Sequence, residues 1–275
     1  MTDTRHRNLT AVIFDWAGTT IDHGSFAPMG AFVRLFAQHG IELSIAQARG
    51  PMGLPKWDHI QALTRLPEVA AQWQAREGRP PNDADVDALY AEFTPMNAAS
   101  VRDHARLIDG VLPTVQALRA RRLRIGSTTG YNREIMDVVL PLAAAQGYAP
   151  DNLVCADDLA AGRPTPVAIY RCFADLAVWP PRTVVKVDDT APGMAEGAAA
   201  GCWCVGVVAS GNGVGLAAAD WAALPEAAKA AHRARVGAEL RAAGAHLLVD
   251  TVVELPSAID SLEARLRAGE VPAAA

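Results

Sequence analysis

The chain has 275 residues, a hydrophobic fraction of 51% and a formal net charge of −5 at pH 7. This length and apolar content suit a globular protein with one large domain, or with a core domain and a smaller companion. An acidic chain lacks the excess of positive charge that binding to nucleic acid or to an anionic membrane surface requires. We therefore expect a small-molecule partner and no nucleic acid.

No stretch approaches the roughly 20 apolar residues that span a bilayer. The first ten residues, MTDTRHRNLT, lack the apolar centre of a secretory signal. We therefore expect a cytoplasmic protein without a membrane segment. The four cysteines form no C-x-x-C pair, and we expect them to be small core side chains rather than metal ligands.

Five short apolar runs end in polar or glycine residues. They are LTAVIFD (9–15), LRIGSTT (123–129), NLVCA (152–156), TVVKVDD (183–189) and CWCVGVV (202–208). Helical periodicity between most of them predicts an α/β fold with a doubly wound parallel sheet. Ligands bind beyond the carboxyl ends of such strands, so Asp15, residues 127–129 and the pair Asp188 and Asp189 would share one crevice.

Residues 24–99 differ in character from the rest of the chain. They contain helical patterns at 27–40, 56–66 and 82–97 and no convincing strand. We expect a helical cap domain inserted after the first strand, with residues 1–23 and 100–275 forming a Rossmann-like catalytic core.

The polar ends of three predicted strands follow a pattern known from one superfamily. Asp15 is followed by Gly18 and Thr19, the second strand ends in STTG and the fourth in VDDT, with AGRPTP at 161–166. In this order the motifs resemble the haloacid dehalogenase superfamily, in which an aspartate nucleophile takes up a phosphoryl group beside Mg²⁺. Its ordinary phosphatases carry a second aspartate, a general acid, two residues after the nucleophile. Here that position is Ala17, so the leaving group must be handled in another way.

Lys56 is a candidate for that task, and it is one of only three lysines in the sequence. In GPMGLPKWDHI it is expected in the first turn of a helix, where the helix dipole disfavours a charged ammonium. A lowered pKa would leave a neutral amine that can form a Schiff base with a carbonyl. His59 lies on the same helix face and could shuttle protons, with a packed or surface histidine as the alternative.

The segments FDWAGTTID, PMG before Lys56, DH after it, IGSTTGY, AGRP and VKVDDT together resemble the phosphonatase family of that superfamily. The resemblance implies cleavage of phosphonoacetaldehyde to acetaldehyde and phosphate, in the breakdown of 2-aminoethylphosphonate. The chemistry agrees, because breaking a C–P bond would release a carbanion. An iminium on Lys56 converts this carbanion into a neutral enamine, so no acid at position 17 is required.

For the metal site, the resemblance implies that Asp15 is both the nucleophile and a ligand of Mg²⁺. The backbone carbonyl of Ala17 and the carboxylate of Asp189 would be the other protein ligands. Many superfamily members carry a further acid four residues after the metal aspartate, where this chain has Gly193. Asp188 would then contact the residues that bind the metal ion and not the ion itself.

For the substrate, the resemblance implies that Thr129 and the backbone N–H of Gly130 hold the phosphoryl oxygens, with Arg163 supplying positive charge. Met52 and His59 would line the aldehyde side. Some phosphonatases carry a cysteine where this chain has Ser25. The resemblance also implies a homodimer formed through the helical insertion.

Several alternatives remain at this stage. A magnesium-dependent phosphomonoesterase of the same superfamily is disfavoured by Ala17, because an alkoxide would leave unprotonated. A catalytically silent binding protein is disfavoured by the presence of Asp15, Lys56 and Asp189 together. Lys186 is either a charge near the phosphoryl group or a packed strand residue. The run SGNGVG at 210–215 lacks the spacing of a dinucleotide motif, and we expect a loop.

Overall fold

The computed structural model describes residues 8–273. Its centre is a parallel sheet of five strands in the order β2-β1-β3-β4-β5. The strands are β1 (Ala11–Phe14), β2 (Arg124–Ser127), β3 (Val184–Asp188), β4 (Trp203–Val207) and β5 (Leu247–Val249). The predicted α/β class and parallel sheet are therefore confirmed.

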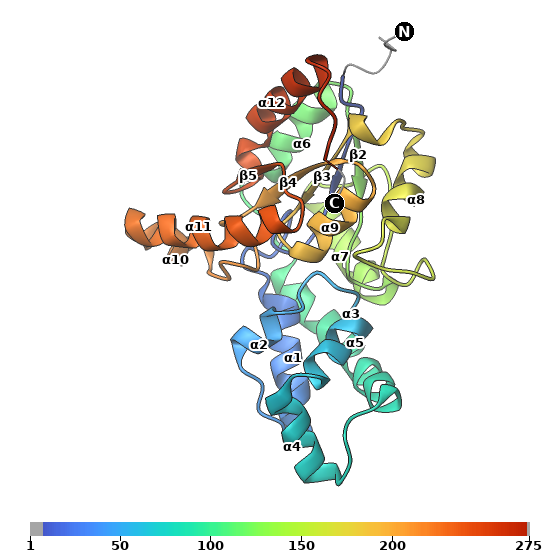
Figure 1. Ribbon diagram of the computed structural model, residues 1–275, viewed down its shortest axis with the longest axis vertical. Coiled ribbons are helices and arrows are strands. Elements are labelled where there is room, and N and C mark those ends of the chain that lie inside the picture. Colours follow the sequence, from blue (N-terminus) through green and yellow to red (C-terminus); the bar gives the residue numbers. More distant parts are fainter. Residues whose placement is uncertain (1–7, 274–275) are drawn as a thin grey trace.

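Helices of the core pack on both faces of this sheet (Figure 1). They are α6 (Val111–Ala120), α7 (Arg133–Ala145), α8 (Val167–Leu176), α9 (Ala191–Ala199), α10 (Ala218–Ala223), α11 (Glu226–Ala242) and α12 (Leu255–Arg267), with short 3-10 turns η2 (Pro181–Thr183) and η3 (Val252–Glu254). Alternate residues of β1 face opposite clusters: Val12 and Phe14 pack with α6, α7 and α12, whereas Ala11 and Ile13 pack with α8. Burial on both faces explains the nearly continuous apolar runs.

The strand predicted at 152–156 is wrong. Val154 forms a single bridge with Thr128, because the chain turns at once and Asp158 accepts a hydrogen bond from the backbone N–H of Cys155 (2.7 Å). The sheet has instead a three-residue edge strand, β5, which no expectation included. A run of this length has no periodicity that separates it from a loop.

The insertion after β1 is helical, as predicted. It contains α1 (Phe26–Gln38), α2 (Ile45–Arg49), α3 (Lys56–Thr64), α4 (Pro67–Glu77) and α5 (Asp83–His104). Figure 1 shows these helices grouped at one end of the molecule, beyond the sheet. The rings of Phe32 on α1 and Phe93 on α5 stack with centroids 4.3 Å apart. The domain limit expected between residues 99 and 100 falls within α5.

The chain passes between core and cap twice, before α1 and after α5, and the side chain of Asp22 contacts both connections. Its carboxylate accepts hydrogen bonds from the backbone N–H groups of Phe26 (3.0 Å) and Ala27 (2.9 Å) at the start of α1. It also lies 3.4 Å from Nδ1 of His104 at the end of α5. One buried carboxylate therefore contacts both connections, in addition to backbone hydrogen bonds such as that from the N–H of Ile108 to the carbonyl oxygen of Thr20 (2.9 Å). None of the helices between residues 8 and 273 is long and apolar enough to cross a membrane.

Replacement of Asp22 tests these contacts. Asp22→Ala removes both hydrogen bonds and leaves alanine at a φ of 53°, where aspartate is better tolerated. We expect the free energy of unfolding in urea to fall by about 2 kcal/mol. Asp109→Ala is the control, because this exposed carboxylate pairs only with the exposed Arg106 in the described chain. Equal effects of the two variants would contradict the assignment.

Candidate active site

A small pocket lies where the cap meets the carboxyl ends of β1, β2 and β3. Its lining residues are Asp15, Ala17, Ser25, Pro28, Met52, Gly53, Lys56, Thr129, Gly130, Tyr131, Arg163 and Thr190. This set brings together all the residues predicted for the site except His59 and Asp189. The pocket has a volume of about 20 Å³, which is room for about one water molecule.

The sheet register explains why distant residues meet here. Phe14 of β1 is paired with Ser127 of β2 on one side and with Val187 of β3 on the other. The residues that follow each strand, including Asp15 and Asp189, therefore leave the sheet at the same edge. This is the edge at which parallel sheets bind their ligands.

Three carboxylates crowd at this edge. Asp15, Asp188 and Asp189 are buried and offer oxygens that all lie within 4.8 Å of one another. Burial and, next, the charge of Asp188 raise the pKa of Asp15 to about 6. Burial and the charges of Asp15 and Asp188 also raise the pKa of Asp189 well above its ordinary value. Such a cluster is stabilised by a hard divalent cation, whose preferred ligands are carboxylate oxygens.

The two adjacent aspartates have different surroundings. Asp188 pairs with Lys186 (3.0 Å) and Arg163 (3.3 Å). Burial alone would raise its pKa, but these two cations hold it below its ordinary value. Asp189 forms no ion pair with any residue between 8 and 273, and accepts hydrogen bonds from Thr19 (3.1 Å) and the backbone N–H of Asn212 (2.6 Å). Asp189 is therefore the carboxylate left available for a cation.

Arg163 lines the pocket and is held there by a buried polar network. Its Nη2 lies 2.9 Å from Oδ1 of Asp15, and its Nε donates to Oε2 of Glu196 (3.1 Å). The hydroxyl of Thr128 accepts from Arg163 Nη2 (2.9 Å) and Lys186 Nζ (2.8 Å) and donates to Glu196 Oε2 (2.9 Å). This uses the full hydrogen-bonding capacity of a hydroxyl. Lys186 is thus a buried charge of this network and does not line the pocket.

Sequence reasoning missed Glu196, and it placed Thr128 at the crevice without giving it a role. Glu196 is the one charged residue of α9, whose sequence is APGMAEGAA. A single acid among small and apolar residues in a helix is a sign of a buried partner, and this signal could have identified it. The absence of an acid at position 193 also has a physical reason. A Cβ atom on Gly193 would lie 2.0 Å from Asp188 Oδ2.

The network predicts a large effect of Lys186 on stability. Lys186→Met leaves Asp188 and Glu196 to share Arg163, and we expect the free energy of unfolding to fall by about 3–5 kcal/mol. Adding Glu196→Gln removes one uncompensated charge, so the double variant should be more stable than Lys186→Met alone. Lys229→Met serves as the control in the same urea titrations. A double variant that is less stable than Lys186→Met would refute the pairing.

Lys56 is the first residue of α3, as predicted, and only 4% of it is exposed. Its Nζ lies 5.1 Å from the ring centre of Tyr131 and 5.8 Å from that of Phe32. Burial lowers the pKa of Lys56 to about 8, although Asp15 and Asp189 oppose this shift. The amine is therefore held among aromatic rings in a form that readily loses its proton. The sequence argument relied on the helix dipole and did not include this burial.

His59 lies behind Lys56 rather than in the pocket. It is fully buried, stacks on Phe32 with ring centres 3.9 Å apart, and its Nε2 lies 3.0 Å from the carbonyl oxygen of Ala48. Burial and the charge of Lys56 lower its pKa well below the ordinary value, so the ring is neutral. Its Nδ1 has no hydrogen-bond partner within residues 8–273.

The cap reaches the core at two close contacts of residues 53–55. A Cβ on Gly130 would lie 2.7 Å from the carbonyl oxygen of Leu54, and one on Gly162 would lie 2.4 Å from Pro55. Only glycine at these two core positions lets the loop before Lys56 come so near. These contacts place Lys56, a cap residue, in the same pocket as Asp15 of the core.

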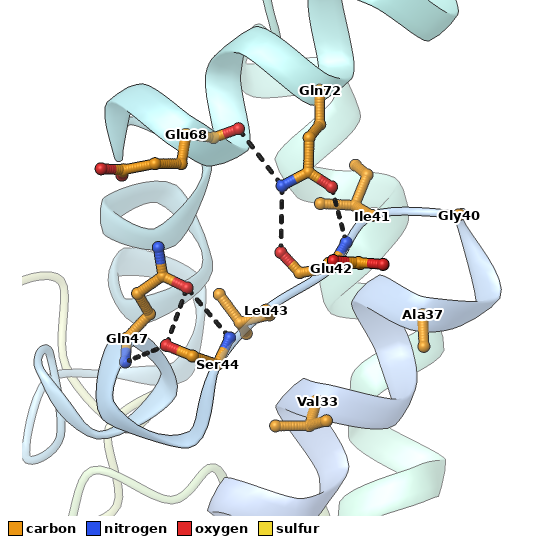
Figure 2. A pocket seen from close by; sticks show the side chains of 10 residues that line it. All are labelled: Val33, Ala37, Gly40, Ile41, Glu42, Leu43, Ser44, Gln47, Glu68 and Gln72. Atoms are coloured by element: carbon orange, nitrogen blue, oxygen red, sulfur yellow. Dashed lines mark hydrogen bonds between the residues drawn. The ribbon is translucent and has the colours of Figure 1, made fainter.

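A larger cavity lies within the cap, between α1, α2 and α4 (Figure 2). Its volume is about 710 Å³. Gln72 spans one side, where it accepts a hydrogen bond from the backbone N–H of Glu42 (2.7 Å) and donates to the carbonyl oxygens of Glu42 (3.1 Å) and Glu68 (3.2 Å). No residue predicted for the active site lines this cavity, so volume alone does not identify the site.

The titration of Lys56 can be measured directly. After reductive ¹³C-methylation, its NMR signal, assigned with Lys56→Arg, should titrate with a midpoint near pH 8. Below this pH the ammonium predominates and the amine fraction falls tenfold per unit, so reactivity toward aldehydes should rise as the pH increases through 8. A midpoint at the ordinary lysine value of 10.5 would contradict the burial of this amine.

Comparison with known proteins agrees with this geometry. The sequence pattern of the haloacid dehalogenase-like hydrolases matches residues 9–201. The phosphonoacetaldehyde hydrolase of Paraburkholderia xenovorans is 48% identical over 266 residues, which cover 97% of this chain and 100% of that protein. That of Klebsiella pneumoniae is 49% identical, with 96% and 99% covered. A phosphonoacetaldehyde hydrolase-like protein from Oleispira antarctica has a crystal structure that matches with a TM-score of 0.94 at 40% identity, over 96% of each chain.

The fold, the carboxylate cluster and the matched pattern define a hydrolase of the haloacid dehalogenase superfamily. Sequence identity of 48% and 49% to two phosphonoacetaldehyde hydrolases, over nearly the whole chain, narrows this assignment from the superfamily to one family. Within the superfamily the chain belongs to the phosphonoacetaldehyde hydrolase family.

Proposed function

We propose that the protein hydrolyses the C–P bond of phosphonoacetaldehyde to give acetaldehyde and phosphate, in the degradation of 2-aminoethylphosphonate. The observation that carries this proposal is the position of Lys56. Its amine, with a pKa of about 8, lines the same small pocket as Asp15. An amine that attacks a carbonyl and a carboxylate that attacks phosphorus are the two nucleophiles that this substrate needs.

The first step is condensation of the Lys56 amine with the aldehyde, which releases water and forms an iminium. The C–P bond then breaks, its electron pair passes to the iminium to give an enamine, and the phosphoryl group passes to Asp15. Protonation of the enamine at carbon and hydrolysis release acetaldehyde and free Lys56. Water attacks the aspartyl phosphate and releases phosphate. Cleavage of the C–P bond itself has no leaving oxygen to protonate, which agrees with alanine at position 17 and disfavours a phosphomonoesterase.

Arg163, Thr129 and Gly130 would hold the phosphoryl group. Thr129 Oγ1 accepts a hydrogen bond from the backbone N–H of Tyr131 (3.1 Å), which leaves its O–H group free to donate to a phosphoryl oxygen. Arg163 remains cationic, because Glu196, Asp188 and Asp15 raise its pKa against the effect of burial. Charge-assisted donors of this kind stabilise the developing negative charge.

The carboxylates fit a resident Mg²⁺, because Asp15 and Asp189 are crowded together and Asp189 has no cationic partner in the described chain. These two side chains and the backbone carbonyl of Ala17 would hold it. The ion supplies positive charge that lets both carboxylates stay ionised beside a phosphoryl group.

The pocket must open before the substrate can enter. A volume of about 20 Å³ does not admit a molecule of seven non-hydrogen atoms, so the cap has to move away and return. Met52, at 5% exposed, would then close over the aldehyde side, whereas His59, buried and bonded to the carbonyl oxygen of Ala48, would support the helix that carries Lys56 and not exchange protons with the substrate. A homodimer through the cap and a cytoplasmic location remain predictions.

The proposal is tested by phosphate release. With Mg²⁺, phosphonoacetaldehyde should react at least about 100-fold faster than an alkyl phosphate such as glycerol 2-phosphate, because an alkoxide leaving group has no general acid here. Borohydride added with acetaldehyde should trap a reduced adduct on Lys56, seen by mass spectrometry. Lys56→Arg should lose both properties and still bind Mg²⁺, since a guanidinium stays protonated.

Lys229→Arg is the matched control and should retain turnover and trapping. An adduct found on Lys186 or Lys229, or turnover without any trapped adduct, would contradict a Schiff base on Lys56. Equal rates with the two substrates would favour the phosphomonoesterase alternative.

A further inference from the structure

The loop SGNGVG at 210–215, which the reaction itself does not use, contacts the carboxylate of Asp189. The backbone N–H of Asn212 donates to Asp189 Oδ2 at 2.6 Å. On the other side, Thr19 Oγ1 donates to Oδ1 at 3.1 Å. Each oxygen of Asp189 is therefore oriented by one hydrogen bond, and one of the two comes from this loop.

The side chain of the same asparagine binds the cap. Arg49 Nη1 donates to Asn212 Oδ1 (2.9 Å), and Asn212 Nδ2 donates back to the carbonyl oxygen of Arg49 (3.2 Å). Arg49 is the last residue of α2, and its guanidinium also donates to the carbonyl oxygens of Gly24 (2.7 Å) and Gly215 (3.3 Å). Two hydrogen bonds that run in opposite directions fix both the distance and the orientation of Asn212 relative to Arg49.

The loop is shaped for this contact. Gly215 has a φ of +67°, and a Cβ atom there would lie 2.7 Å from the guanidinium carbon of Arg49. Arg49 also stands directly before the loop that carries the reactive lysine, since its carbonyl oxygen accepts a hydrogen bond from the backbone N–H of Met52 (3.1 Å). Asn212 thus contacts the anchor of the cap loop with its side chain and a carboxylate of the metal site with its backbone.

We propose that Asn212 is a positioning residue that couples the seating of the cap on the core to the orientation of Asp189. When Arg49 binds Asn212, the loop 210–215 is held where the backbone N–H of Asn212 orients the carboxylate of Asp189. By linkage, a divalent cation bound at Asp189 favours the docked cap to the same extent that the docked cap favours the cation. This inference rests on the metal site of the proposed function.

The test measures Mg²⁺ binding by calorimetry in the absence of substrate. Asn212→Ala keeps the backbone N–H but loses both side-chain hydrogen bonds with Arg49, and Arg49→Ala loses the bonds of the guanidinium to Asn212, Gly24 and Gly215. We expect each variant to bind Mg²⁺ about tenfold more weakly, as is typical when a group that orients a ligand is removed. The double variant should lose less affinity than the sum of the two single losses, because both single variants break the bond between Arg49 Nη1 and Asn212 Oδ1.

Arg65→Ala, at an exposed arginine of the cap, is the matched control and should bind Mg²⁺ like the unmodified protein. As a second measurement, Mg²⁺ should slow hydrogen exchange of the amides in residues 50–55 of the unmodified protein, and should slow it much less in Asn212→Ala. Unchanged Mg²⁺ affinity in Asn212→Ala and Arg49→Ala, or fully additive losses in the double variant, would overturn the coupling and leave the proposed reaction standing. An unmodified protein that binds no Mg²⁺ would overturn the metal site as well.

Discussion

Repulsion between buried carboxylates is the constraint on which the rest of the site depends. The adjacent parallel strands β1 and β3 place the carboxylates of Asp15, Asp188 and Asp189 close together. Three buried negative charges at this distance are stable only when positive charge offsets their repulsion. The protein supplies part of the positive charge through Arg163, which pairs with Asp15 and Asp188, and through Lys186, which pairs with Asp188. Asp189 pairs with no cation among residues 8–273, and the metal ion proposed for this cluster would supply the positive charge that is still needed there.

The features that could be predicted from the sequence are those encoded in contiguous residues. A buried parallel strand is a short apolar run, so β1 and β3 and the aspartates after them were identified correctly. The start of α3 at Lys56 follows from the preceding glycine and proline residues. The helical insertion was recognisable by its different periodicity. The particular chemistry came from the motif resemblance and not from these patterns.

The features that could not be predicted depend on contacts between distant segments. Glu196 and Thr128 gain their importance from Arg163, which lies more than 30 residues from each of them. The low pKa of Lys56 comes from its burial between cap and core, and no local pattern reports this. Likewise the loop around Asn212 carries no motif, and its contacts with Arg49 and Asp189 exist only in the folded chain.

The scarcity and burial of lysine make Lys56 a natural probe of cap motion. Lys186 is fully buried in the core and Lys56 is covered by the junction of cap and core, whereas Lys229 lies on α11, outside this junction. With the cap motion proposed above, a bulky acylating reagent that cannot enter the closed pocket would modify Lys56 only while the cap is open, and Lys229 would provide an internal reference for reagent strength. The ratio of the two labelling rates therefore reports the population of the open protein, without any introduced dye or spin label.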